Sequence, residues 1–135
     1  MPYQDCCKNG HPWTPENTKR QNKKLTKRRC RTCSNIEQNK LTARVKAETI
    51  AAYGNRCACC GETEIAFLSI DHKFGGGNEH RRSLKRIGGK AFYYWLKRQG
   101  YPQDDYQVLC HNCNQAKSAY GICPHQAELP FAEAA

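Results

Sequence analysis

The 135-residue sequence lacks a long hydrophobic run. It contains no run of about 20 apolar residues, which is the length needed to cross a membrane. It also has no N-terminal apolar segment of the kind found in signal peptides. We therefore expect a cytoplasmic protein without a membrane partner. Hydrophobic residues make up 39% of the chain and the mean hydropathy is −0.88, so apolar burial alone is not expected to stabilise all of it.

Acidic residues are also scarce, with 12 Asp and Glu against 22 Lys and Arg and a net charge of +10. Between Lys19 and Lys46 there are eleven basic residues and one acid, Glu37. A solvated helical face is one interpretation, but so strong a bias favours a polyanionic partner, because phosphate binding releases counterions. No apolar helix face accompanies the charge, so nucleic acid is favoured over a membrane surface. The candidate DNA contacts in this run are Lys27, Arg28 and Arg29.

Cysteine, by contrast, is abundant, with ten residues. In a reducing cytoplasm, paired Cys-x-x-Cys units bind metal more often than they form disulfides. Zinc prefers four soft ligands in a tetrahedron, and a two-residue gap lets one turn present two thiolates to it. The strongest such set is Cys57, Cys60, Cys110 and Cys113. A second is Cys7, His11, Cys30 and Cys33, in which Gly10 permits a tight turn.

Three further features leave alternatives open. Cys6 competes with Cys7 as a ligand, and spacing alone does not separate them. Cys59 lies inside the first two-residue gap, and we expect it to be unligated. For Cys123 and His125, packing of a small thiol beside a capped histidine is favoured over a third metal site. The sequence therefore predicts two structural zinc ions.

The order of these features predicts four segments. Residues 1–33 are rich in Pro, Asn and Thr and should form loops around an N-terminal zinc-binding knuckle. Residues 34–54 should form a basic linking helix, with Ser34 as N-cap, Glu37 completing a capping box and Gly54 as the stop. Residues 55–125 form a second unit, and residues 126–135 a flexible tail.

Within the second unit, residues 66–71 and 106–109 are typical of short strands. Residues 75–77, all glycine, should break any regular element. The aromatic residues at 92–95 indicate a helix that packs into a core, which is favoured over a base-stacking platform. Residues 112–119 should form a short helix after the last zinc ligands.

Asp71 and His72 end the first of these strands and precede the glycine run. Alone, they would be interpreted as a strand cap and a surface histidine. Asn114, directly after the last zinc ligand, favours another interpretation, because zinc would hold its helix beside the strands and bring Asn114 near Asp71. Two such oxygen ligands, with waters and a phosphate oxygen, suit Mg²⁺. His72 could then remove a proton from water, since imidazole exchanges protons near neutral pH.

Four stretches in order resemble the HNH endonucleases: YGNRCACCGE, LSIDHKFGGGNEHRR, YYWLKRQGYP and YQVLCHNCNQAKSAYGICPH. Together they span roughly residues 53–125. CKNGHPWTPENT with RRCRTC resembles the zinc knuckle that precedes the nuclease in compact phage-type members. The resemblance implies a small α+β fold: a ββα-metal HNH unit stapled by a four-cysteine zinc site, preceded by a zinc knuckle and a linking helix.

The resemblance also implies roles. It makes His72 the general base, and Asp71 and Asn114 the ligands of one catalytic Mg²⁺ or Mn²⁺. The middle letter of HNH is an Asn that orients the loop holding the base; here it falls on Asp105, a departure that can alter basicity or activity. Candidate contacts to the DNA backbone, otherwise solvated surface residues, are His80, Arg81, Arg82 and Lys117.

The implied reaction is hydrolysis of a phosphodiester bond in double-stranded DNA. The implied setting is phage DNA processing or packaging, with the proteins of those processes as partners, in the host cytoplasm. Two alternatives remain: a non-catalytic zinc-dependent DNA-binding module and a branched-DNA resolvase.

Overall fold

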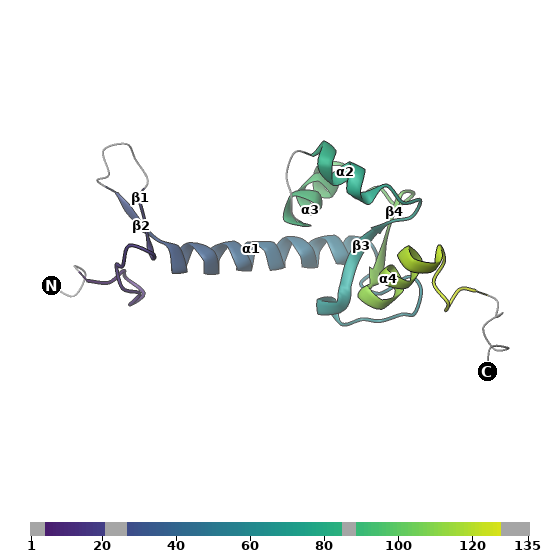
Figure 1. Cartoon of the computed structure of the whole chain (residues 1–135), viewed down its shortest axis with the longest axis horizontal. Coiled ribbons are helices and arrows are strands. Elements are labelled where there is room, and N and C mark those ends of the chain that lie inside the picture. Colours follow the sequence, from purple (N-terminus) through teal and green to yellow (C-terminus); the bar gives the residue numbers. More distant parts are fainter. Residues whose placement is uncertain (1–4, 21–26, 85–88, 128–135) are drawn as a thin grey trace. The chain divides into compact units, whose positions relative to one another are not determined.

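The computed structural model describes residues 5–20, 27–84 and 89–127 (Figure 1). The chain divides into two compact units, Met1–Arg44 and Val45–Ala135, called here the N-terminal and C-terminal units. It is a small α+β protein with two separate two-stranded antiparallel sheets among the described residues. Of the expected flexible tail, residues 128–135 lie outside the described part of the chain. No described helix has the length and apolar content needed to cross a membrane.

The N-terminal unit contains a hairpin that the sequence did not predict. Strand β1 (Thr18–Arg20) pairs with β2 (Arg28–Cys30), with Thr18 opposite Cys30. The expectation of loops alone over residues 1–33 was therefore wrong at these positions. Three-residue strands are too short to show an alternating pattern, which explains the error.

Helix α1 (Arg31–Ala52) begins three residues earlier than predicted. The side-chain oxygen of Asn17 accepts hydrogen bonds from the backbone N–H and the hydroxyl of Thr32, at 2.9 and 2.8 Å. The sulfur of Cys30 accepts from the N–H of Cys33 at 3.4 Å. These groups satisfy the first free N–H groups of the helix, so Ser34 lies inside it. Glu37 forms no capping box and pairs with Arg29 at 3.4 Å.

The C-terminal unit is built on one strand pair and the helix that follows it. Strands β3 (Leu68–His72) and β4 (Tyr106–Cys110) are antiparallel, with Asp71 opposite Gln107 and His72 opposite Tyr106. The expected start of the first strand, residues 66–67, lies instead in the 3₁₀ turn η1 (Ile65–Phe67). Helix α4 (His111–Tyr120) follows β4 without a loop and contacts both strands. The core includes Leu68, Ile70, Leu96, Val108 and Leu109.

Two more helices complete this unit. The glycine run does not break structure throughout, because α2 (Gly77–Ser83) begins at its last residue. Gly75 and Gly76 have φ of 78° and 81°, and this left-handed pair turns the chain from β3 into the helix. Helix α3 (Gly89–Arg98) buries Phe92 and Leu96, and Trp95 packs against the core. The prediction that the aromatic segment forms core is confirmed.

Candidate metal centres and reactive pocket

The four predicted ligands of the N-terminal knuckle lie together. All ligand atoms of Cys7, His11, Cys30 and Cys33 are within 4.8 Å of one another. The Cys7 sulfur is 3.7 Å from the Cys33 sulfur and 3.4 Å from Nδ1 of His11. Tetrahedral zinc, with Zn–S of about 2.3 Å and Zn–N of about 2.0 Å, needs separations of about 3.8 and 3.5 Å. The group therefore has the size of a zinc site, and Cys6 is not one of its members.

The four-cysteine group of the C-terminal unit also comes together, from the loop before β3 and from the start of α4. The ligand atoms of Cys57, Cys60, Cys110 and Cys113 lie within 4.8 Å of one another, and the sulfurs of Cys60 and Cys110 are 3.7 Å apart. A backbone hydrogen bond of 2.8 Å from Ala58 to Val108 joins the loop to β4. Both predicted cysteine groups could therefore hold a metal ion.

One cysteine in each group is prepared to bind as a thiolate. Burial raises the pKa of Cys57, but backbone N–H groups, first that of Cys60, outweigh it and lower the pKa to about 6. Burial also raises the pKa of Cys30, but hydrogen bonds from the N–H of Cys33 and the amide of Asn17 outweigh it and lower the pKa to about 6. Because zinc binds the thiolate form, these hydrogen bonds favour metal binding.

A third group also comes together, at the Cys123–His125 pair for which packing was favoured over a metal site. Cys59, Cys113, Cys123 and His125 have ligand atoms within 4.8 Å of one another, although we expected Cys59 to be unligated and the Cys123–His125 pair merely to pack. Cys113 therefore belongs to two groups. Cys59 belongs to no separate Cys-x-x-Cys pair, so its approach to Cys123 and His125 had no signal in the sequence.

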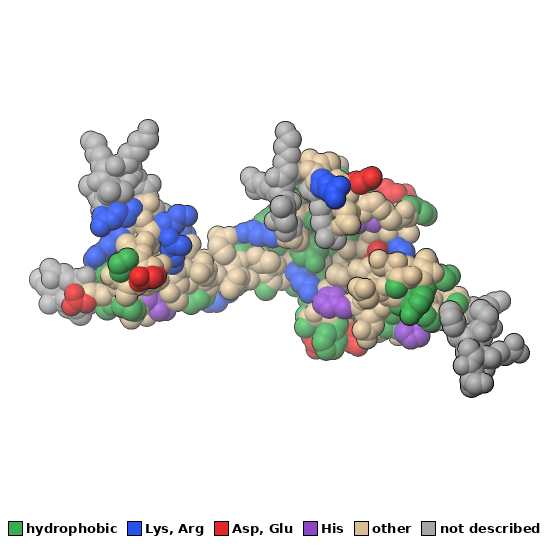
Figure 2. Space-filling model, in the orientation of Figure 1, with side chains coloured by type: hydrophobic (Ala, Val, Ile, Leu, Met, Phe, Trp, Pro, Cys, Tyr) green, Lys and Arg blue, Asp and Glu red, His purple; other side chains and the backbone are tan. Residues whose placement is uncertain are grey.

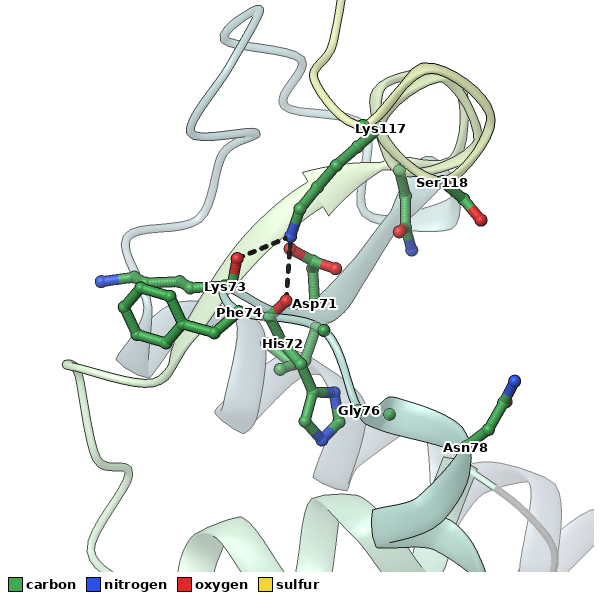
Figure 3. Close-up of a pocket in the computed structure, with 13 residues that line it drawn as sticks. Asp71, His72, Lys73, Phe74, Gly76, Asn78, Lys117 and Ser118 are labelled. Carbon is green, nitrogen blue, oxygen red and sulfur yellow. Dashed lines mark hydrogen bonds and ion pairs between the residues drawn. The ribbon is translucent and has the colours of Figure 1, made fainter.

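Three of the four predicted reactive residues, Asp71, His72 and Asn114, line one pocket of about 560 Å³ in the C-terminal unit, and Asp105 is not among its lining residues (Figure 3). Asp71 and His72 come from the end of β3, and Asn114 and Lys117 from α4. Gly75, Gly76 and Gly77 form another part of its wall. Asn114 and Lys117 are neighbours on one face of α4, because residues three apart are adjacent on a helix. The strand–strand–helix connection thus brings Asp71, His72 and Asn114 to a single pocket.

Asp71 is held through one oxygen. The ammonium group of Lys117 forms an ion pair with Oδ2, and Gln107 donates a hydrogen bond of 2.9 Å to the same atom. Oδ1 accepts no hydrogen bond from the described residues, which leaves it for a cation. Gln107 was missed by the sequence reasoning, although the register that places it opposite Asp71 would have indicated it.

Lys117 was expected to contact the DNA backbone, but in the structure its ammonium group binds protein groups. Besides Asp71, its ammonium donates to the carbonyl oxygens of His72 and Lys73, at 2.9 and 3.1 Å. Figure 3 shows this side chain reaching from α4 to the end of β3. Lys117 therefore fixes the helix against the segment that carries the candidate base.

His72 is oriented by a second histidine. Its Nε2 lies 2.9 Å from Nδ1 of His80, and its ring stacks on Phe92 with the centroids 5.1 Å apart. The Nδ1 atom of His72 lies on the side of the glycine run, 3.1 Å from where a Cβ on Gly77 would be. His80, expected on the DNA backbone, packs its ring against Trp95 at 4.4 Å. His80 therefore contacts His72 directly. The absence of a side chain at Gly77 leaves room beside the His72 ring.

Asp105 contacts the loop through its backbone. Its carbonyl oxygen accepts a hydrogen bond of 2.9 Å from the N–H of Lys73, and its side chain is exposed. That bond does not depend on residue type, so Asp in place of Asn leaves it intact.

The remaining candidate DNA contacts lie on surfaces. Lys27, Arg28 and Arg29 are exposed, and Figure 2 shows Lys and Arg side chains gathered over the N-terminal unit. The guanidinium of Arg28 stacks over Trp13 at 4.4 Å. Arg82 is exposed on α2, whereas the side chain of Arg81 lies outside the described part of the structure. Their contact with DNA stays a prediction.

Replacing Lys117 with Met is expected to lower the free energy of unfolding by about 1–3 kcal/mol. The reason is that the largely buried carboxylate of Asp71 would lose its charged partner. The side chains of Lys117 and Asp71 are only 23% and 11% exposed. Urea denaturation with zinc present measures the change. Lys73→Met is the control, since the ammonium of Lys73 makes one exposed hydrogen bond, to the carbonyl of Gln103, and should change stability by less than about 0.5 kcal/mol. Equal effects of the two variants would contradict the role given to Lys117.

Comparison of the chain with protein-family models, with curated proteins and with solved structures finds no match. The strongest parts of the chain's own geometry are the metal-sized cysteine groups and the pocket beside them.

Proposed function

We propose that this chain is a metal-dependent DNA endonuclease of the HNH type. The observation that carries the proposal is the single pocket lined by Asp71, His72 and Asn114, at the junction of two antiparallel strands and the helix that follows them. A carboxylate, an imidazole and an amide are the groups needed for cation-assisted hydrolysis of a phosphodiester. A non-catalytic zinc module would account for the cysteines and the positive charge, but it gives no reason for this grouping.

In the proposed mechanism, Asp71 and Asn114 would hold Mg²⁺ or Mn²⁺ through side-chain oxygens, a donor set that suits these hard cations. A cation bound there would stabilise the charge that develops on the phosphate and on the leaving 3′-oxygen. Gln107 and Lys117 fix the carboxylate of Asp71 through Oδ2, and no described residue donates a hydrogen bond to Oδ1. The side chains of Asp71 on β3 and Asn114 on α4 could therefore provide oxygen ligands for a cation at the pocket.

His72 accepts the proton from the attacking water. As water attacks phosphorus in line, the bond to the 3′-oxygen breaks, and that oxygen takes a proton from solvent. His80 orients the base through the 2.9 Å contact between its Nδ1 and Nε2 of His72. The proposed zinc ions take no part in this chemistry and hold the strands and α4 in place.

The expected substrate is double-stranded DNA, because the net charge of +10 favours a polyanion. Exposed Lys27 and Arg28, together with Arg82, are proposed to contact its phosphates. Such contacts position DNA without specifying sequence. A branched-DNA resolvase would use a related site, and comparison of four-way junctions with linear duplex as substrates separates it from the proposed activity.

The proposal is tested on supercoiled plasmid. Wild-type protein is expected to nick or cut it with added Mg²⁺ or Mn²⁺, and not without an added cation. Asp71→Asn should lower the rate by at least about tenfold, because the cation loses its anionic ligand. Glu79→Gln, which removes an exposed acid on α2, should cut as the wild type does. Binding of plasmid without cleavage under every condition would favour the non-catalytic module.

A further inference from the structure

We propose that Cys113 bridges two zinc ions, so that the C-terminal unit holds a second zinc ion bound by Cys59, Cys113, Cys123 and His125. This site would be structural, and it is independent of the proposed nuclease activity. It adds a third zinc ion to the two predicted from cysteine spacing.

The distances in this group match the edges of a zinc tetrahedron. Nδ1 of His125 lies 3.5 Å from the Cys113 sulfur and 3.5 Å from the Cys123 sulfur. A tetrahedral zinc ion with one nitrogen and one sulfur ligand requires a separation of about 3.5 Å. The adjoining four-cysteine group has the wider sulfur–sulfur edge, 3.7 Å between Cys60 and Cys110. These three distances agree with the edges expected for the two donor sets, and all ligand atoms of each group lie within 4.8 Å of one another.

The number of ligands explains why Cys113 would be shared. The first group is complete with four thiolates, and it leaves Cys59, Cys123 and His125 as three ligands beside it. Closed structural zinc sites have four ligands. A thiolate sulfur has more than one lone pair, so Cys113 can complete the second tetrahedron while it remains in the first. Both sites are then closed.

Simple packing explains these three residues less well. His125 is exposed, so its ring could extend into solvent, yet its Nδ1 faces two sulfurs at equal distance. Cys123 is only 4% exposed. A backbone hydrogen bond of 2.8 Å from Gln126 to Cys123 closes the turn that carries both side chains. This turn thus presents a thiol and an imidazole to the same point.

The second zinc ion would fasten α4 at both ends. Cys113 lies in its first turn, and Cys123 and His125 follow its last residue, Tyr120. Asn114 and Lys117, which line the pocket, lie between these two attachments. Cys59 would connect the far attachment to the loop before β3.

Loading the full-length protein with ¹¹³Cd tests the shared ligand directly. We expect three cadmium resonances, two of them split by coupling through the bridging sulfur, and one of that pair shifted as expected for three sulfurs and one nitrogen. Absence of any coupled pair would overturn the proposal. This measurement uses wild-type protein, so it does not depend on whether a variant folds.

Zinc content measured by elemental analysis gives a second test. The double variant Cys123→Ser with His125→Ala is expected to contain one zinc ion fewer per chain than the wild type. His111→Ala, which removes an exposed histidine of α4 outside all three groups, should lose none. An unchanged zinc content in the double variant would overturn the second site. Plasmid cleavage is not used as a readout, so failure of the nuclease proposal leaves these results interpretable.

Discussion

Replacing His72 with alanine is expected to lower the rate of plasmid cleavage by about 10²–10⁴-fold, the usual contribution of a general base. His72 is the imidazole at the end of β3 that lines the pocket with Asp71 and Asn114. Without it, no proposed group accepts the proton of the attacking water. Zinc content should not change, because His72 belongs to none of the three groups of metal-sized geometry.

Two further variants separate chemistry from packing. His72 stacks on Phe92 and contacts His80, so alanine could disturb the aromatic side of the pocket. His72→Gln keeps an amide that can hydrogen bond to His80 but cannot act as a base near neutral pH, and it should be as inactive as alanine. His111→Ala should retain activity. Cleavage by both His72 variants at the wild-type rate would contradict the mechanism.

Sequence spacing identified ligands where a turn alone brings them together. Cys57 with Cys60, and Cys110 with Cys113, are each separated by two residues, and the structure places all four within 4.8 Å. The Cys59 group depends on the return of the chain after α4, which has no local signal. The same limit explains why the start of α1 was predicted three residues too late. Its first N–H groups are capped partly by Asn17, which lies before the hairpin, whereas the prediction used only the local capping preference of Ser34.

The sequence predicted three residues of the pocket, but it did not predict which side chains contact them. Asp71, His72 and Asn114 were selected from residue type and order, and they line one pocket. Lys117 and His80 were predicted to contact the DNA backbone, because charge and polarity in a sequence do not indicate a partner within the protein. The strand register places Gln107 opposite Asp71, and the position of α4 beside β3 gives Lys117 its carboxylate.

Removal of zinc is expected to unfold the C-terminal unit. Its core includes Cys57, Cys110, Cys113 and Cys123 among the buried residues, so candidate metal ligands occupy positions that aliphatic side chains fill in other small domains. Structural zinc contributes an apparent 10–16 kcal/mol in small zinc-dependent folds, at or above the roughly 5–15 kcal/mol stability of a whole domain. Chelation should abolish the near-ultraviolet circular dichroism of the aromatic residues around Phe92, and added zinc should restore it whereas Mg²⁺ should not.

A single substitution isolates the ligand from the packing. Cys60 is exposed, so Cys60→Ser leaves no cavity in the core, and any loss of stability reports the lost zinc ligand. We expect this variant to bind less zinc and to unfold at a lower denaturant concentration. Cys6→Ser is the matched control, since Cys6 is in none of the three groups, and it should retain the wild-type zinc content. A C-terminal unit that stays cooperatively folded after complete zinc removal would show that its apolar residues suffice, and the zinc sites would lose their structural role.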